Sequence, residues 1–157
     1  MDTVADSRTF SHTTLRVATQ HPTQFIDLTD EVEALVSKAG IHTGFVNIQS
    51  LHTTTAVVVN EHEPLLLSDV AAVLERIAPL EAVYRHDNLS LRTSNCVLAE
   101  RPNGHSHCRA ILLAPSACLN VAGARLQLGR WQRVFLAELD GPRPREVSVL
   151  IVGAGGR

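Results

Sequence analysis

The order of strand-like and helix-like segments constrains the fold of this chain more than any other feature of its sequence. Residues 44–51 alternate between apolar and polar side chains, as in a strand with one buried face. After Pro64, which suits the first turn of a helix, apolar residues recur at helical spacing. The expected strands cover residues 9–17, 24–27, 44–51, 56–59, 117–122, 125–129, 133–139 and 147–152. The expected helices cover residues 29–39, 64–78 and 105–113.

Early strands, two to three helices and a closing run of antiparallel strands predict a compact α+β fold with a mainly antiparallel sheet. At 157 residues the chain fits a single domain, 1–157, with 1–8 and 153–157 as loose tails. We expect Thr29 to be the N-cap of the first helix and Gly40 to be its C-cap.

Composition excludes several classes of function. Binding nucleic acid requires a clustered basic surface, and a formal net charge of −2 gives no electrostatic reason to expect one. No apolar run approaches the roughly 20 residues of a membrane helix, and the polar first ten residues do not form a signal peptide. The cysteines, Cys96, Cys108 and Cys118, are odd in number and predict reduced, mostly buried thiols. We therefore expect a cytoplasmic protein that binds neither nucleic acid nor membrane.

Eight histidines are many for a chain of this length. Three of them have polar neighbours in strand or turn positions and are predicted to be surface residues: His12, His21 and His42. The other five lie at bends, in loops or near the ends of elements: His52, His62, His86, His105 and His107. A catalytic zinc site usually takes three protein ligands and keeps one position for water, so one reading is a metal site. The alternative is an ordinary mixture of surface and core histidines.

Other strings leave two interpretations open. Glu61 follows an apolar strand, so it either caps the next helix or belongs to a site, as does its neighbour Asn60. Trp131 either pins a hairpin from the core or forms a pocket wall, with Gln132 as a polar contact. A serine hydrolase is excluded because the G-x-S-x-G turn is absent. A Cys108 nucleophile beside His107 is disfavoured, since adjacent helical residues point in different directions.

Five strings in this order resemble the YjbQ family, often labelled secondary thiamine-phosphate synthase. They are His52-Thr53-Thr54-Thr55-Ala56, Asn60-Glu61, His86-Asp87, Asn103-Gly104-His105-Ser106-His107 and Leu128-Gly129-Arg130-Trp131-Gln132. The resemblance covers residues 10–152 and implies an α+β fold, a homotrimer and a divalent metal, expected to be zinc. The chain departs from the family pattern at Thr54, where many relatives have serine, and in a longer stretch over 88–102, which can reshape the pocket mouth.

The resemblance assigns roles to residues of this chain. It implies His52, His86 and His107 as metal ligands. Glu61 and Asp87 match the accompanying polar positions, where they either orient the metal ligands or supply, one or the other, the catalytic base. Residues expected to contact a small anionic or phosphorylated ligand are Asn60, Asn103, His105, Arg109, Arg130, Trp131 and Gln132.

Two functions follow as expectations. The first is a metal-dependent enzyme of small phosphorylated metabolites, which hydrolyses a phosphoester or transfers a pyrimidine unit onto a phosphorylated thiazole. The second is a non-catalytic trimeric module that binds a metal or anion, with the metal structural. A plain scaffold whose histidines bind nothing is a third, weaker reading.

Overall fold

The computed structural model describes residues 8–97 and 99–155 and confirms the α+β fold. In chain order the elements are β1 (Arg8–Ala18), β2 (Gln24–Asp27), α1 (Thr29–Ala39), β3 (Ile41–Ser50), β4 (Thr55–Glu61), α2 (Pro64–Ile77), the short 3₁₀ helix η1 (Arg85–Asp87), α3 (Gly104–Leu112), β5 (Ser116–Ala122), β6 (Arg125–Leu126), β7 (Gln132–Glu138) and β8 (Pro144–Gly155). No helix of the described ranges combines the length and the apolar character that crossing a membrane requires.

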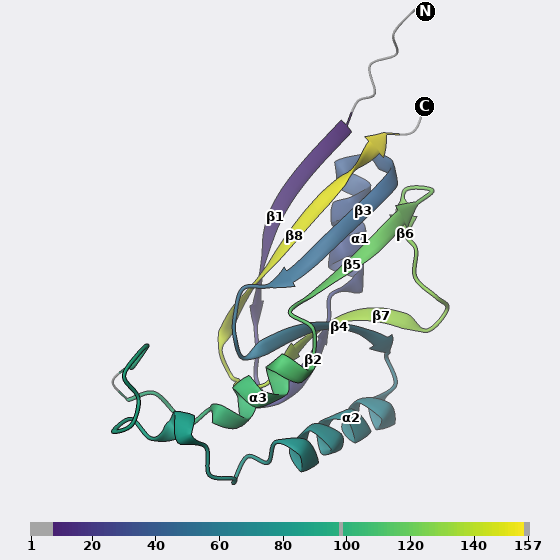
Figure 1. Ribbon diagram of the computed structural model, residues 1–157. Coiled ribbons are helices and arrows are strands. Elements are labelled where there is room, and N and C mark those ends of the chain that lie inside the picture. The colour runs from purple at the N-terminus through teal and green to yellow at the C-terminus, as the bar shows by residue number, and fades with distance from the viewer. Residues whose placement is uncertain (1–7, 98, 156–157) are drawn as a thin grey trace, which may run out of the picture.

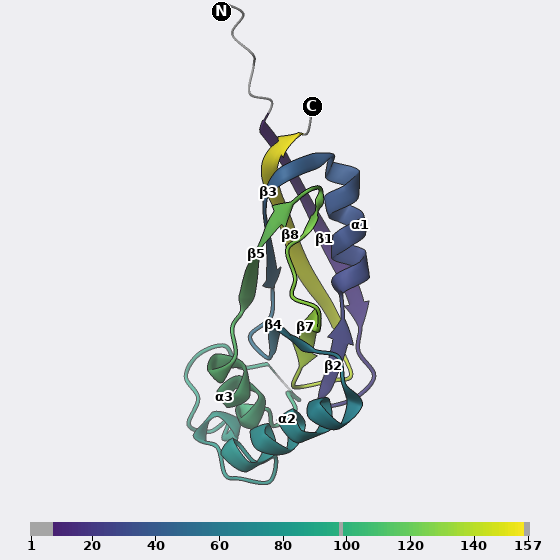
Figure 2. The ribbon, with the colours of Figure 1, turned by 90° about the vertical axis from the view of Figure 1, so that its right-hand side faces the viewer.

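The strands form two antiparallel sheets. One has five strands in the order β1-β8-β3-β5-β6, and the other has three in the order β2-β7-β4. The five-stranded sheet is long and twisted, and the three-stranded sheet lies near its lower half (Figure 1). Helices α2 and α3 lie at the lower end, away from both ends of the chain (Figures 1 and 2).

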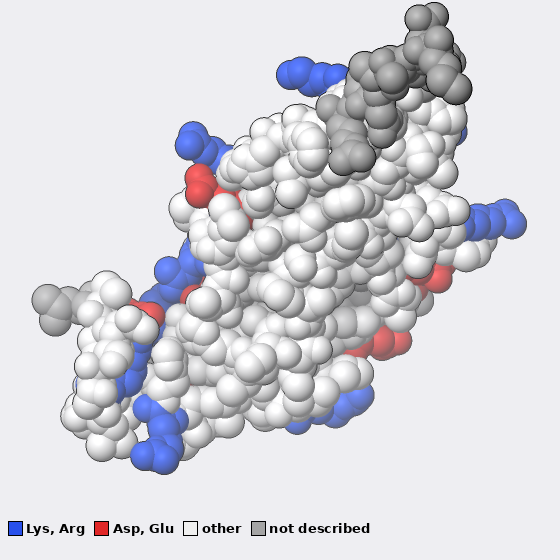
Figure 3. Space-filling model, turned by 45° about the horizontal axis from the view of Figure 1, so that its top comes forward, with Lys and Arg blue, Asp and Glu red and all other residues white. Residues whose placement is uncertain are grey.

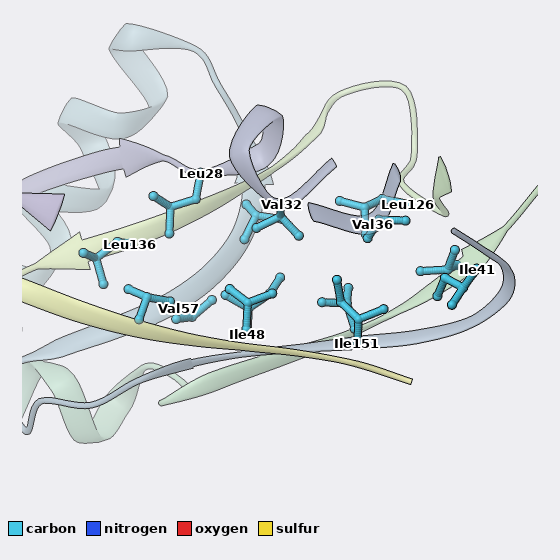
Figure 4. Packing of buried hydrophobic residues seen from close by; sticks show 14 residues of the cluster. Leu28, Val32, Val36, Ile41, Ile48, Val57, Leu126, Leu136 and Ile151 are labelled. Carbon is cyan, nitrogen blue, oxygen red and sulfur yellow. The ribbon is translucent and has the colours of Figure 1, made fainter. Parts of the chain in front are cut away.

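The core lies between the five-stranded sheet, α1 and the three-stranded sheet (Figure 2). Val32 and Val36 of α1 are fully buried, and Ile48 and Ile151 meet them from the sheet (Figure 4). As the alternation predicted, Val46, Ile48 and Ser50 are buried on β3. Each such apolar side chain contributes roughly 1.5–3 kcal/mol when it leaves water.

The opposite face of the five-stranded sheet is left uncovered by the described helices. Phe10, Phe45 and Leu150 on this face are 70%, 40% and 37% exposed. Phe10 and Phe45 both pair with Val152 in the strand register, so the two aromatic rings stand on one face. Figure 3 shows that this side carries few charged side chains, most of them near its rim.

Several predicted boundaries need correction. Helix α1 begins at Thr29 itself, whose hydroxyl accepts the backbone N–H of Val134 at 2.8 Å instead of capping the helix. Gly40 does end α1 in the left-handed conformation, with φ of 66°. The strand expected over 125–129 is only two residues long, because the chain leaves the sheet after Leu126.

The predicted tails are shorter than expected, and the thiols lie elsewhere than expected. Strand β1 begins at residue 8, and β8 continues through Gly155, because the two ends of these strands pair with each other. Residues 1–7, 156 and 157 lie outside the described part. Cys96, Cys108 and Cys118 are free, as predicted, but exposed rather than buried.

Candidate functional site

Three segments converge at the lower end of the molecule and enclose a polar pocket of about 300 Å³. They are the loop between β3 and β4, the stretch from residue 100 into α3, and the turn from β7 into β8. The residues that line the pocket are Leu51, His52, Thr53, Thr54, Glu100, Asn103, His107, Asp140, Arg143 and Arg145.

Two further hollows adjoin this polar pocket. One, of about 620 Å³, lies under the 91–95 stretch and includes His86, Glu100 and His107. The other, here called the apolar groove, has a volume of about 420 Å³ and runs along α3. Its lining residues are His52, Thr53, Thr55, His107, Ala110, Ile111, Leu113 and Pro115. Thr53 and His107 line all three spaces, so the three hollows adjoin one another at these two residues.

His86 and His107 form the part of the site that suits a metal. Their ring centroids lie 4.6 Å apart in an edge-on arrangement. The Nε2 atom of His86 is buried and has no hydrogen-bond partner within the described residues, which in a native site calls for an explanation such as an ion or water. Burial, together with nearby His86, lowers the pKa of His107. A neutral imidazole is the form that binds a metal, so this pair fits two ligand positions.

His52 does not fit the metal role that the sequence predicted for it. Its Nε2 accepts the backbone N–H of Glu146 at 2.8 Å. Burial and the charge of Arg145 lower the pKa of His52, so the ring is neutral. A neutral imidazole with Nε2 as acceptor carries its proton on Nδ1 and has no lone pair left for a metal. In this arrangement His52 is a hydrogen-bond donor at the pocket wall.

The predicted three-histidine set is therefore not assembled. Across residues 8–97 and 99–155, no three His, Cys, Asp or Glu side chains are grouped so that they could hold one metal ion. The chain supplies the His86–His107 pair, while His52 lines the polar pocket with its Nε2 bonded to the backbone of Glu146.

Asp87 builds the start of α3 instead of facing a substrate. Its Oδ1 accepts the backbone N–H groups of Asn103 and Gly104, at 2.9 and 2.8 Å. These are donors that a helix start leaves unpaired. The helix start also packs closely against Tyr84. A Cβ on residue 104 would lie 2.4 Å from Cβ of Tyr84, so this position requires glycine. Asp87 thus fixes the first turn of the helix that carries His107.

Asn103 presents an unsatisfied acceptor at the pocket. Its Nδ2 donates to Oδ2 of Asp140 at 3.1 Å, and its Oδ1 is buried with no partner among the described atoms. Asp140 also forms an ion pair with Arg143 at 2.8 Å. Of the residues expected to contact a ligand, Asn103 is the one that the structure places in the polar pocket.

A buried ion pair between Glu138 and Arg145 holds the pocket residues Arg145 and Thr54 in place. Nε and an Nη atom of Arg145 donate to the two carboxylate oxygens of Glu138, each at 2.6 Å, and the two side chains are 4% and 0% exposed. Arg145 also donates to Oγ1 of Thr54 at 3.0 Å. Burial alone would raise the pKa of Glu138, but the hydrogen bonds from Arg145 and the backbone of Asp140 lower it. The pair fixes the loop after His52 against the start of β8.

Five charged residues of this site were not predicted from the sequence. They are Glu100, Glu138, Asp140, Arg143 and Arg145. One signal was present: Glu138 is charged in a run that is otherwise apolar over 134–139, and such a charge is rarely buried without a partner. The partner lies across a hairpin turn and has no motif of its own.

Arg109 and His105 have structural roles here. Arg109 is 3% exposed and donates to the carbonyl oxygen of Ala78 at 2.9 Å and to the carboxylate of Glu75. It therefore joins α3 to α2 and is not free to neutralise a ligand. His105 is buried, and its Nε2 is hydrogen-bonded to the hydroxyl of Ser106 at 2.9 Å.

The remaining predicted residues lie at the other end of the three-stranded sheet. Asn60 and Glu61 end β4 and pair with Arg133 and Gln132 of β7. Strand β4 begins beside the pocket at Thr55, and its seven residues span about 20 Å at ~3.3 Å per residue. Arg130 stacks on the ring of Trp131 at 4.6 Å, and Trp131 is 60% exposed. Trp131 is thus neither a core residue nor a wall of the polar pocket.

A family model described as "UPF0047 protein YjbQ-like" matches residues 13–154 of the chain. A UPF0047 protein from Methanothermobacter thermautotrophicus is 37% identical over 139 residues, which cover 88% of this chain and 90% of the relative. One from Archaeoglobus fulgidus is 37% identical over 135 residues, covering 86% and 96%.

Solved structures agree with this match. A YbjQ-like protein of unknown function from Sulfolobus solfataricus superimposes with a TM-score of 0.84 at 31% identity, covering 94% of this chain and 99% of that one. A hypothetical protein from Aeropyrum pernix gives a TM-score of 0.80 at 31% identity, with 91% and 98% covered.

Proposed function

The chain belongs to the family of YjbQ-like UPF0047 proteins, and from this premise we propose that it is a metal-dependent enzyme of a small phosphorylated metabolite. The polar pocket binds the phosphate, and His86 and His107 hold a divalent cation, with zinc as the first candidate. The two reactions that suit such a site are hydrolysis of a phosphoester and the transfer implied by the label secondary thiamine-phosphate synthase.

The observation that carries the proposal is the buried Nε2 of His86 that lacks a hydrogen-bond partner. A buried polar atom without a partner costs about 1–3 kcal/mol. Binding a cation there removes that cost, and His107, whose ring centroid lies 4.6 Å from that of His86, is the proposed second ligand. Imidazole is the commonest protein ligand for zinc.

The charges of the pocket explain why the anion and the cation belong together. Arg143 is already paired with Asp140, and Arg145 with Glu138. A phosphate entering the pocket therefore needs additional positive charge, and a cation at His86 and His107 provides it. The donors that orient the phosphate are Nδ1 of His52 and the hydroxyl of Thr53.

Proton transfer falls to a residue other than those first expected, because Asp87 caps α3 and Glu61 lies about 20 Å away along β4. Glu100 lines the polar pocket and the hollow beside His86. A hydrogen bond from Arg92 lowers the pKa of Glu100, which keeps the carboxylate ionised at neutral pH but also makes it a weaker base. Its role as proton acceptor therefore rests on its position between the two spaces. The bound cation would polarise a phosphate oxygen or activate a water molecule.

The absence of Asp87 and Glu61 from the polar pocket also favours the second candidate function, a non-catalytic trimer that binds a metal and an anion. In that case the chain binds phosphate without turning it over. For the trimer itself, the uncovered face with Phe10, Phe45 and Leu150 is the proposed contact surface. Light scattering on wild type and on Phe10→Ser tests it, and a mass of three chains that falls in the variant is expected.

Elemental analysis of tag-free, zinc-incubated and desalted protein tests the metal. We expect one zinc per chain in wild type, and none in His86→Ala or His107→Ala. His62→Ala, at an exposed site, is the matched control and keeps its zinc. A wild type without zinc refutes the metal site.

Turnover separates the two candidate functions. Zinc-loaded protein is screened against phosphate monoesters and against a pyrimidine diphosphate with a phosphorylated thiazole. Glu100→Gln is expected to lose at least about 100-fold in rate and to keep its zinc, while Glu81→Gln retains full rate. Phosphate binding with no turnover on any substrate would establish the non-catalytic module instead.

A further inference from the structure

We propose that the apolar groove holds the organic part of the ligand, so that the metabolite is the phosphate ester of an apolar group and not of a sugar or polyol. This inference rests on the proposed function, because it assumes that the phosphate lies in the polar pocket. It adds the chemical class of the group that the phosphate carries.

The polar pocket and the apolar groove are neighbouring spaces that share three lining residues and differ in the rest of their surfaces. His52, Thr53 and His107 line both of them. Beyond these shared residues, four charged side chains and Asn103 line the polar pocket, together with Leu51 and Thr54. The groove is instead lined by Ala110, Ile111, Leu113 and Pro115, together with Thr55. A ligand that extends past the shared residues therefore has its phosphate in the polar pocket and its organic part against an apolar surface.

The helix that presents His107 also presents the groove. Ala110 and Ile111 follow His107 by three and four residues, so they lie on the same face of α3. Leu112, five residues after His107, does not line the groove. The first turn of α3 is fixed by Asp87, so the position of the apolar surface relative to His107 is fixed as well.

Apolar burial gives this groove its selectivity. Ile111 is 84% exposed, which leaves most of its side chain for a ligand to cover. Each methylene group that leaves water gains about 0.8 kcal/mol, or roughly fourfold in affinity. Hydroxyl groups of a sugar would lose their water beside Ala110, Ile111, Leu113 and Pro115, which offer no side-chain hydrogen-bond partner, and this is unfavourable. A volume of about 420 Å³ accommodates a ring or a short chain.

Calorimetric titration of zinc-loaded protein with a series of phosphates tests the inference. The probes are inorganic phosphate, methyl phosphate, propyl phosphate and glycerol phosphate. We expect about tenfold tighter binding of propyl than of methyl phosphate, and glycerol phosphate no tighter than methyl phosphate. Ile111→Gln flattens this series, whereas the matched control Leu112→Gln, on the same turn of α3, retains it. Inorganic phosphate binds equally to all three proteins.

Each alternative outcome has a definite meaning. A flat series in wild type, with inorganic phosphate bound, overturns the groove inference and leaves the proposed function standing. No binding of any phosphate overturns both. A steep series that Ile111→Gln leaves unchanged, together with a lower mass of that variant by light scattering, shows that a second copy of the chain covers the groove, and this too overturns the inference.

Discussion

The two ends of the three-stranded sheet both carry a carboxylate paired with an arginine, yet only one of them looks like a site. At the far end, Asp27 accepts Nε of Arg133 at 2.7 Å and is paired with Nδ1 of His62 at 2.9 Å. At the pocket end, Glu138 accepts from Arg145, but Nε2 of His86 and Oδ1 of Asn103 nearby have no partner in the described ranges. A polar cluster is common in proteins, whereas buried polar atoms left unsatisfied are rare and indicate a binding site.

Burial separates the two ends further. The side chains of Glu138 and Arg145 are 0% and 4% exposed, against 14% and 36% for Asp27 and Arg133. Removing one partner of a buried pair leaves a charge without water or counter-charge, and the cost falls as water gains access. The two ends should therefore respond differently to equivalent substitutions.

The largest effect is expected from Arg145→Met. It leaves Glu138 buried without its counter-charge, and we expect a loss of about 3–5 kcal/mol in the free energy of unfolding, measured by urea titration. Arg16→Met is the control, because Arg16 pairs with Glu146 on the same sheet but is 87% exposed. A loss at Arg145 no larger than that of the control would show that burial does not strengthen the dependence of Glu138 on its partner.

Asp27→Asn should cost less, about 2 kcal/mol at pH 7. Burial alone would raise the pKa of Asp27, but hydrogen bonds from Arg133 and Thr29 lower it to about 2 from 3.8. A lowered carboxyl pKa stabilises the fold above the unfolded value of 3.8, and this stability is lost as the pH falls toward 2. The difference between wild type and variant should therefore vanish between pH 4 and pH 2 in urea titrations. A difference that persists at pH 2 would contradict the assignment.

A third effect, smaller for each group, concerns the histidines of the pocket end. Burial lowers the pKa values of His52, His105 and His107 below the usual 6.5. Their neutral forms stabilise the fold above pH 6.5, and this stability is lost as the pH falls through the lowered values. NMR titration should show these three rings titrating below pH 6.5. Titration of His52 above pH 6.5 would refute its proposed tautomer.

The smallest effects are expected at the far end. Glu61 ends β4, about 20 Å along the strand from the pocket, and Trp131 precedes the residue that pairs with it. For Glu61→Gln and Trp131→Phe, zinc content and phosphate affinity should therefore stay within about twofold of wild type. Elemental analysis and calorimetry check this. Loss of zinc or phosphate in either variant would join the two ends functionally, for instance across a subunit contact.

Most of the fold was predictable because it depends on local patterns. The alternation of 44–51, the proline at residue 64 and the glycine at residue 40 each predicted the element or end that the structure has. Thr29 was predicted wrongly because a threonine near a helix start looks the same in sequence whatever its hydroxyl binds. Here the hydroxyl does not cap the helix but accepts the backbone N–H of Val134 in β7. Sequence patterns do not specify such long-range partners.

The candidate site was predicted less well, for the same physical reason. His86, His107 and Asn103 were identified and lie at one site, but Asp87 and Arg109 bind backbone and helix partners that no motif reveals. Motifs that are close in sequence can also lie far apart in the structure. His52 precedes the start of β4, whereas Glu61 is the last residue of that strand. Charged residues in unremarkable positions, such as Asp140 and Arg143, enter the pocket only through the turn between β7 and β8.

The pairing of the first and last strands has a practical consequence. Residue 8 faces Ala154 in the register of β1 and β8. These strand ends lie at the opposite end of the molecule from α3 (Figures 1 and 2), whose His107 lines the polar pocket. A surface linker, a fluorophore or a fusion partner attached at either strand end is therefore remote from ligand entry. The same closeness makes the chain suited to circular permutation, with new ends opened in the 88–95 stretch, so that the mouth of the pocket can be altered while both sheets stay covalently continuous.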